Sequence, residues 1–65
     1  MEDFGAIIKE RRIQLKVNQQ TLADLSGVGI NTLVAIERGK GNPSIQVLNK
    51  VLDVLGLQLK ITLKS

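Results

Sequence analysis

The chain has 65 residues, a formal net charge of +3, and neither cysteine nor histidine. A chain of this length builds one small domain whose core supplies only a few kcal/mol, so disulfides, metals or a partner subunit usually add stability. The missing cysteines and histidines exclude disulfides, thiolate catalysis and the commonest zinc ligands. Oligomerisation is therefore the source of stability that remains.

Catalysis and membrane insertion are both disfavoured. The six carboxylates are scattered along the chain, and no pair has the i, i+3 or i, i+4 spacing that would join two of them on a helix. No glycine-rich phosphate loop follows a strand, and no run approaches 18 apolar residues. We expect a cytoplasmic protein that is not an enzyme, does not enter a membrane, and needs no cofactor or metal.

Apolar spacing and capping residues predict four helices. They are expected over residues 3–15, 19–26, 30–38 and 45–55, with N-caps at Asp3, Asn18 and Ser44. Glycines close the last three, at Gly27, Gly39 and Gly56. The spacing predicts a buried face made of Phe4, Ile7, Ile8, Leu15, Leu22, Ala23, Leu25, Leu33, Ile36, Ile45, Leu48, Val51, Leu52 and Leu55.

The spacing of apolar residues changes in the C-terminal tail, residues 57–65. Residues 57–64 alternate apolar and polar side chains, which predicts a β-strand, yet no other segment could pair with it. A second copy of the chain is the simplest partner, so we predict an antiparallel strand pair in a homodimer; a frayed tail with an accidental pattern is the alternative. The chain then divides into a domain at 1–56 and a dimerisation strand at 57–65. The expected interface residues are Val47, Val54, Leu57, Leu59, Ile61 and Leu63.

Residues 18–39 carry the pattern that points to function. Two short helices joined by a three-residue turn with glycine form a helix-turn-helix, whose second helix enters the DNA major groove. Ala23 is small where the helices cross, Gly27 supplies the left-handed residue of the turn, and Val28 fills the gap between them. The pattern predicts double-stranded DNA as the partner.

A set of motifs runs through the stretch from Phe4 to Leu57: Phe4-Gly5, Ile8, Arg12, Asn18–Ala23, Gly27-Val28, Thr32-Leu33, Ile36–Lys40 and Asn42–Ser44. With these motifs the chain resembles the Cro/CI (Xre-type) helix-turn-helix repressors, and most closely the HipB-like antitoxins. The resemblance implies an all-α, four-helix, lambda-repressor-like domain and a homodimeric repressor that binds a palindromic operator. It leaves open an antitoxin whose main role is to neutralise a HipA-like, kinase-fold toxin.

Candidate DNA contacts follow from this reading. Asn31 can pair with adenine in the major groove, whereas apolar side chains can contact only thymine methyl groups. Gly29 stands where the family commonly has a capping Ser or Thr, and offers no side-chain oxygen. The expected base-reading residues are Gln19, Ile30, Asn31, Val34 and Ala35. The expected phosphate contacts are Asn18, Thr32, Arg38, Lys40 and Asn42.

Each of these sets has a structural alternative. Val34 and Ala35 could pack against a neighbouring helix, and Arg38 and Lys40 could be solvated loop charges. The resemblance implies that Arg12 and Glu37 form a partly buried ion pair between the first and third helices. The alternative for Arg12 is a phosphate clamp.

Overall fold

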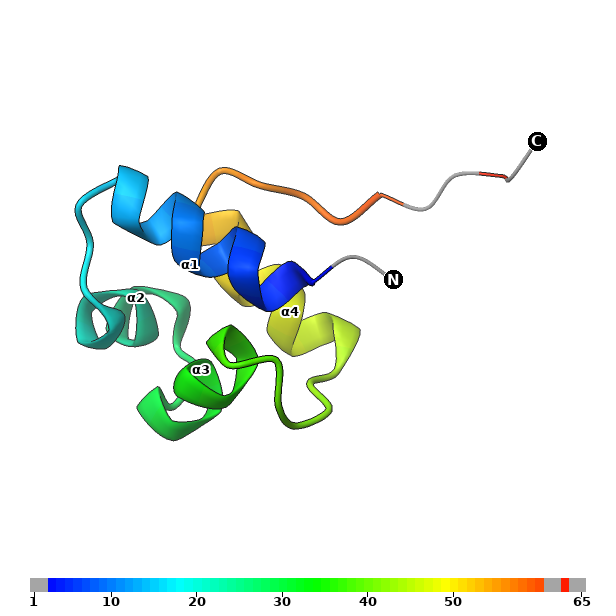
Figure 1. Ribbon diagram of the computed structural model, residues 1–65, viewed down its shortest axis with the longest axis horizontal. Coiled ribbons are helices and arrows are strands. Elements are labelled where there is room, and N and C mark those ends of the chain that lie inside the picture. The colour runs from blue at the N-terminus through cyan, green and yellow to red at the C-terminus, as the bar shows by residue number, and fades with distance from the viewer. Residues whose placement is uncertain (1–2, 61–62, 64–65) are drawn as a thin grey trace.

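The computed structural model describes residues 3–60 and 63, and it confirms the four predicted helices (Figure 1). They are α1 (Phe4–Gln14), α2 (Gln19–Ser26), α3 (Ile30–Glu37) and α4 (Ile45–Val54). The ends of α1, α3 and α4 lie one residue inside the predicted ranges, because Leu15, Arg38 and Leu55 serve as C-caps.

Side-chain caps begin three of the helices, as the sequence predicts. Asp3 accepts from the amide of Ala6, Asn18 from that of Thr21, and Ser44 from that of Val47, at 3.2, 2.7 and 3.1 Å. Gly29 precedes α3 and gives no side-chain hydrogen bond. Each cap satisfies one of the helix N–H groups that lack an intrahelical partner.

The helices end at residues in the left-handed conformation. Gly27, Gly39 and Gly56 have φ between 70° and 72°, and α1 ends in the same way with Lys16 at φ 59°. At the end of α4 the amide of Leu57 donates to the carbonyl of Leu52 at 2.9 Å, which turns the chain back toward the helix.

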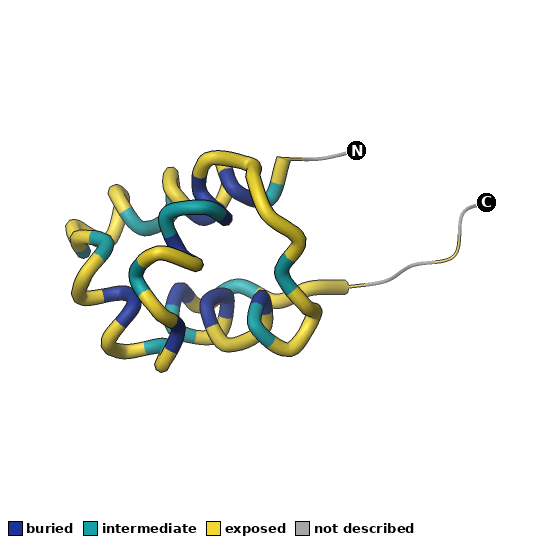
Figure 2. The backbone as a smooth tube through the Cα atoms, turned by 90° about the horizontal axis from the view of Figure 1, so that it is seen from below, coloured by how far each residue is buried: buried dark blue, intermediate teal, exposed yellow. Residues whose placement is uncertain are grey.

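Among the described residues, ten buried apolar residues from the four helices, the α2–α3 turn and the C-cap of α4 make the core. Figure 2 colours the backbone by burial. Four predicted core residues are exposed instead: Ile7, Leu15, Leu25 and Ile45. Each helix is short and turns only a narrow arc toward its neighbours, so residues at the edge of an apolar stripe face solvent. Leu15 also lies beyond the last turn of α1.

Close helix packing around Gly5 brings α1 against α3. A Cβ atom at Gly5, which is buried, would collide with the carbonyl oxygen of Ile36 on α3. Helix α2 packs against both α3 and α4. Helix α1 is tied to α4 by Arg11, whose Nε donates to the carbonyl of Leu55 at 2.9 Å.

A bidentate ion pair joins α1 to α3. Arg12 Nε and Nη2 donate to the two carboxylate oxygens of Glu37 at 2.9 and 3.0 Å. Arg12 Nη1 also donates to the Val17 carbonyl at 2.9 Å, and Gln19 Nε2 donates to Glu37 Oε1 at 3.2 Å. The side chains of Arg12 and Glu37 are only 11% and 2% exposed. Three segments of the chain therefore meet at one buried carboxylate.

The described part of the tail forms no strand within the single chain. Residues 57–60 follow Gly56 without regular structure and leave the end of α4 (Figure 1). Of the predicted interface residues, Val47, Val54 and Leu57 pack partly against the core, while Leu59 is 45% and Leu63 99% exposed. Ile61 lies outside the described residues. The homodimer strand pair stays a prediction.

Replacing Gly5 by alanine should lower the free energy of unfolding by about 1–3 kcal/mol, because α1 must move away from the Ile36 carbonyl. Urea unfolding followed by helical circular dichroism measures the loss. Ala6→Gly, at an exposed position of the same helix, is the control and should cost less than about 1 kcal/mol. A Gly5→Ala variant as stable as the parent chain would contradict the close crossing.

Replacing Arg12 by methionine should cost about 3–5 kcal/mol, because the Glu37 carboxylate would stay buried without its counter-charge. The double variant Arg12→Met/Glu37→Leu removes both charges and should recover most of that loss. Both are compared by urea unfolding at neutral pH. A double variant less stable than either single variant would show that the pair itself supplies the stability.

Candidate nucleic-acid interface

The α2–turn–α3 unit has the geometry that the sequence predicts for a helix-turn-helix. Gly27 takes the left-handed conformation at φ 71°, and the amide of Val28 donates to the Ala23 carbonyl at 3.2 Å. Ala23 and Val28 are both buried. The small side chain lets the two helices approach, and the valine closes the space beneath the turn.

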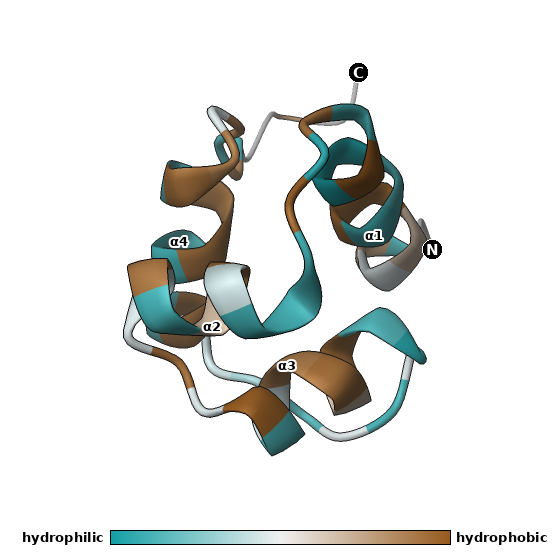
Figure 3. Ribbon diagram, turned by 90° about the vertical axis from the view of Figure 1, so that its left-hand side faces the viewer, coloured by the Kyte–Doolittle hydropathy of each residue, from teal (hydrophilic) through white to brown (hydrophobic). Residues whose placement is uncertain are grey.

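Burial along α3 defines which way the helix faces. Leu33, Ile36 and Glu37 are buried, and the opposite side holds Asn31, Val34, Ala35 and Arg38, which we call the outward face of α3. Asn31 and Arg38 are exposed, while Val34 and Ala35 are half-buried. Helix α3 lies at the edge of the molecule rather than between other helices (Figure 3). A long external ligand can therefore approach this face.

Ile30 and Gln19 are less available than the rest of the predicted base-reading set. Ile30 is half-buried and packs against the core, so only part of its side chain faces outward. Gln19 is also half-buried, and its amide nitrogen donates to Glu37. This bond gives Gln19 a structural role that its position at the start of α2 does not reveal.

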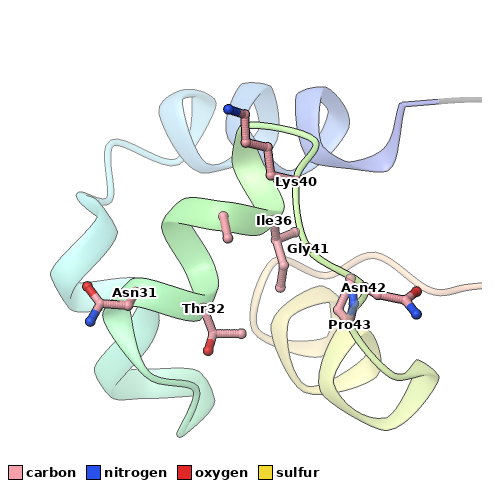
Figure 4. Close-up of a pocket in the computed structure, with 8 residues that line it drawn as sticks. Asn31, Thr32, Ile36, Lys40, Gly41, Asn42 and Pro43 are labelled. Carbon is pink, nitrogen blue, oxygen red and sulfur yellow. The ribbon is translucent and has the colours of Figure 1, made fainter.

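A shallow groove of about 340 Å³ runs between α3 and the loop that leads to α4 (Figure 4). Ala35, Ile36 and Pro43 supply its apolar lining, and Lys40 lies over the C-terminal end of α3. The amides of Asn31 and Asn42 stand on opposite sides of the groove and point away from it (Figure 4). Positive φ angles at Gly39 and Gly41, 72° and 79°, shape this loop.

The predicted phosphate contacts are all exposed, on three separate segments. Asn18 precedes α2, Thr32 lies in the first turn of α3, and Arg38, Lys40 and Asn42 follow α3. The Asn18 side-chain oxygen already accepts the cap bond from Thr21, which leaves its NH₂ group for an outside acceptor. The first N–H groups of α2 add donors at the same end.

Electrostatics favour an anionic ligand on this side. Arg12 and Glu37 neutralise each other in the interior, whereas Arg38 and Lys40 are exposed next to the outward face. Among the described residues no carboxylate lines the groove itself, while Asp3 lines a neighbouring hollow together with Arg38 and Lys40. The site thus combines exposed cations with hydrogen-bond donors.

Two contacts in the structure were not predicted from the sequence. Nothing in the spacing of Arg11 identifies the Leu55 carbonyl, 44 residues away, as its acceptor. The sequence signal for Gln19, a polar residue after an N-cap, is equally typical of a solvated position.

Over residues 3–60 and 63, no helix is long and apolar enough to cross a bilayer. The same residues bring no acidic cluster together that could hold a metal ion.

Comparison with known proteins gives consistent matches. A helix-turn-helix family model matches residues 8–61. The cryptic phage CTXphi transcriptional repressor RstR of Vibrio cholerae is 30% identical over 86% of this chain and 50% of its own length. An uncharacterised HTH-type transcriptional regulator of Haemophilus influenzae is 42% identical, over 86% of this chain and 60% of its own length.

A regulator of the same description from Sinorhizobium fredii is 34% identical, over 91% of this chain and 78% of its own length. The chain thus spans only half to three-fifths of the first two of these relatives. The family model nevertheless covers α2, the turn and α3 completely. Together with the geometry of that unit, the match shows that this chain belongs to the helix-turn-helix family of the Xre/Cro type.

Proposed function

We propose that the protein is a sequence-specific transcriptional repressor that binds a palindromic operator as a homodimer. The observation that carries this proposal is the outward face of α3, which a helix-turn-helix presents to the DNA major groove. The likeness to the repressor of Vibrio cholerae supports it. Autoregulation of its own gene fits such a small repressor.

In this proposal Asn31 is the main hydrogen-bonding reader. It is exposed in the first turn of α3, where recognition helices contact base edges, and its amide can pair with adenine N6 and N7. Ile30, Val34 and Ala35 would add apolar contacts along the same helix. Gln19 would touch DNA only with the part of its side chain that the Glu37 bond leaves free.

Phosphate contacts would come from the ends of the unit. Arg38 and Lys40 stand just past α3, where the flanking DNA backbone would pass, and Asn18 stands at the start of α2. Asn42 points away from α3, so it would reach a phosphate farther along the backbone (Figure 4). Such contacts fix the register of a protein on DNA without reading its sequence.

The dimer would form through the tail. Leu63 is 99% exposed and Leu59 45%, and a lone extended segment leaves its backbone hydrogen bonds unmade. Antiparallel pairing with a second copy would satisfy that backbone and cover Leu57, Leu59, Ile61 and Leu63 together with Val47 and Val54. Two-fold symmetry then places two α3 helices about 34 Å apart, one turn of DNA.

The second candidate function is that of an antitoxin with a HipA-like, kinase-fold toxin as partner. Exposed apolar side chains on α1, Ile7 at 42% and Ile13 at 56%, favour it, because a protein could bind there while α3 holds DNA. A neighbouring gene for a kinase-fold protein would favour this function over a simple repressor.

Selection from random DNA duplexes should yield a palindrome, and Asn31→Ala should weaken binding to it by about 1–3 kcal/mol for each half-site. Fluorescence anisotropy at one fixed salt concentration measures the affinity of the parent chain and of the variant for this palindrome. Gln14→Ala, an amide removed from α1, is the matched control and should bind like the parent chain. Unchanged affinity of the folded Asn31→Ala variant would remove Asn31 from the reading face.

Removing residues 58–65 should convert the dimer into a monomer, while keeping Leu57, which packs on the core and helps to end α4. Sedimentation at micromolar concentration measures the change. Leu59→Ser/Leu63→Ser should have the same effect, and the control Gln58→Ser/Lys60→Ser, on the other side of the alternating pattern, should stay dimeric. An intact dimer of the shortened chain would refute strand pairing.

A further inference from the structure

The outward face of α3 is unusually poor in groups that can hydrogen-bond a base. Its N-terminal and central part holds one amide, Asn31, followed by Val34 and Ala35. Thr32 is exposed and lines the groove together with Asn31 and Ala35, but its hydroxyl is assigned to a phosphate, and Ile30 packs partly inward. Arg38 stands at the opposite end of the helix, beyond the turns that enter the groove.

We propose that each operator half-site is recognised largely through C5-methyl groups that contact Val34 and Ala35, next to an adenine paired with Asn31. This inference rests on the proposed function and specifies the DNA that the site prefers. The occupant is a duplex with thymine, or an equivalent C5-methylated pyrimidine, at fixed positions of the major groove.

The chemistry of the base edges leads to this conclusion. All four bases present hydrogen-bonding groups in the major groove, and among them only thymine adds a methyl group. An apolar side chain against a polar edge displaces water and leaves donors or acceptors unpaired, which costs affinity. Against a thymine methyl, the same side chain gains apolar contact. Val34 and Ala35 therefore favour one base by contact and disfavour the others.

Helix geometry sets where the methyl groups must lie. Val34 and Ala35 follow Asn31 by three and four residues, which is about 4.5–6 Å along the helix axis. Successive base pairs are about 3.4 Å apart. The methyl groups should therefore lie within one or two base pairs of the adenine that Asn31 contacts, and the half-site is a short block with fixed internal order.

A consequence separates methyl contact from a general preference for A·T pairs. 5-Methylcytosine carries the same C5-methyl group as thymine but pairs with guanine. The outward face holds no polar side chain next to Val34 that could bond the exocyclic amino group of 5-methylcytosine. The methyl group of 5-methylcytosine should therefore restore affinity that unmethylated cytosine lacks. The C5-methyl group should then contribute to binding in both base pairs.

The experiment uses the full chain and the palindrome selected from random duplexes. Each thymine within two base pairs of the adenine assigned to Asn31 is replaced in turn by uracil, which removes only the methyl group. At the contacted position we expect about a fourfold loss for each methyl, the value of one buried methylene group. Replacement of that T·A pair by 5-methylcytosine·G should bind about fourfold more tightly than replacement by C·G.

A thermodynamic cycle assigns the methyl group to a side chain. At the position that Val34 contacts, exchanging thymine for uracil should hardly change the affinity of the Val34→Ala variant, because the side chain that contacts this methyl group has been removed. Thymines outside the half-sites serve as the control, and their replacement by uracil should change nothing. A melting curve of Val34→Ala checks that the variant remains folded.

Other outcomes distinguish a failure of methyl recognition from a failure of the proposed repressor function. Uracil duplexes that bind the parent chain as tightly as thymine duplexes would overturn methyl recognition, while sensitivity to Asn31→Ala would keep the repressor proposal in place. A selected half-site without thymine beside the adenine would overturn it as well. Failure to select any duplex would overturn both the repressor proposal and the inference.

Discussion

The buried carboxylate of Glu37 is the constraint around which the domain is arranged. An ionised carboxylate that is 2% exposed is tolerated only when its oxygens are paired, and here Arg12 and Gln19 supply three donors. The donors come from α1 and from the start of α2, and the carboxylate comes from α3. The rotation of α3 about its own axis is thereby fixed relative to two other elements.

That rotation decides which residues of α3 can face DNA. With Glu37, Leu33 and Ile36 turned inward, Asn31, Val34 and Ala35 must turn outward. The pair also takes Arg12 out of the surface charge, so the exposed cations near α3 are Arg38 and Lys40. A buried ion pair adds little net stability, and we interpret this one as a device that specifies geometry.

Arg11 fixes the position of a second element, the C-terminal end of α4. Its bond to the Leu55 carbonyl places a cation at the C-terminus of α4, where the helix dipole favours positive charge. Leu57 is held beside it by the backbone bond to Leu52 and by its packing on the core. The direction in which the tail leaves the domain is therefore set by the bond from Arg11 to Leu55 and by the contacts of Leu57. In the proposed dimer, the same contacts would govern the spacing of the two α3 helices.

The local sequence was sufficient to predict the four helices, three side-chain caps and the turn at Gly27, because these depend on interactions within a few residues. It also predicted that Asn31, Val34 and Ala35 lie on the outward face of α3, since Leu33 and Ile36 mark the inner side, but not that Ile30 packs partly against the core. It did not predict that Ile7, Leu15, Leu25 and Ile45 are exposed, or that Gly5 lies against the Ile36 carbonyl. Those features depend on how far each short helix turns toward neighbours distant in the chain. The acceptors of Arg11 and Gln19 were decided only by the tertiary structure, because a long polar side chain can reach many partners and packing selects one.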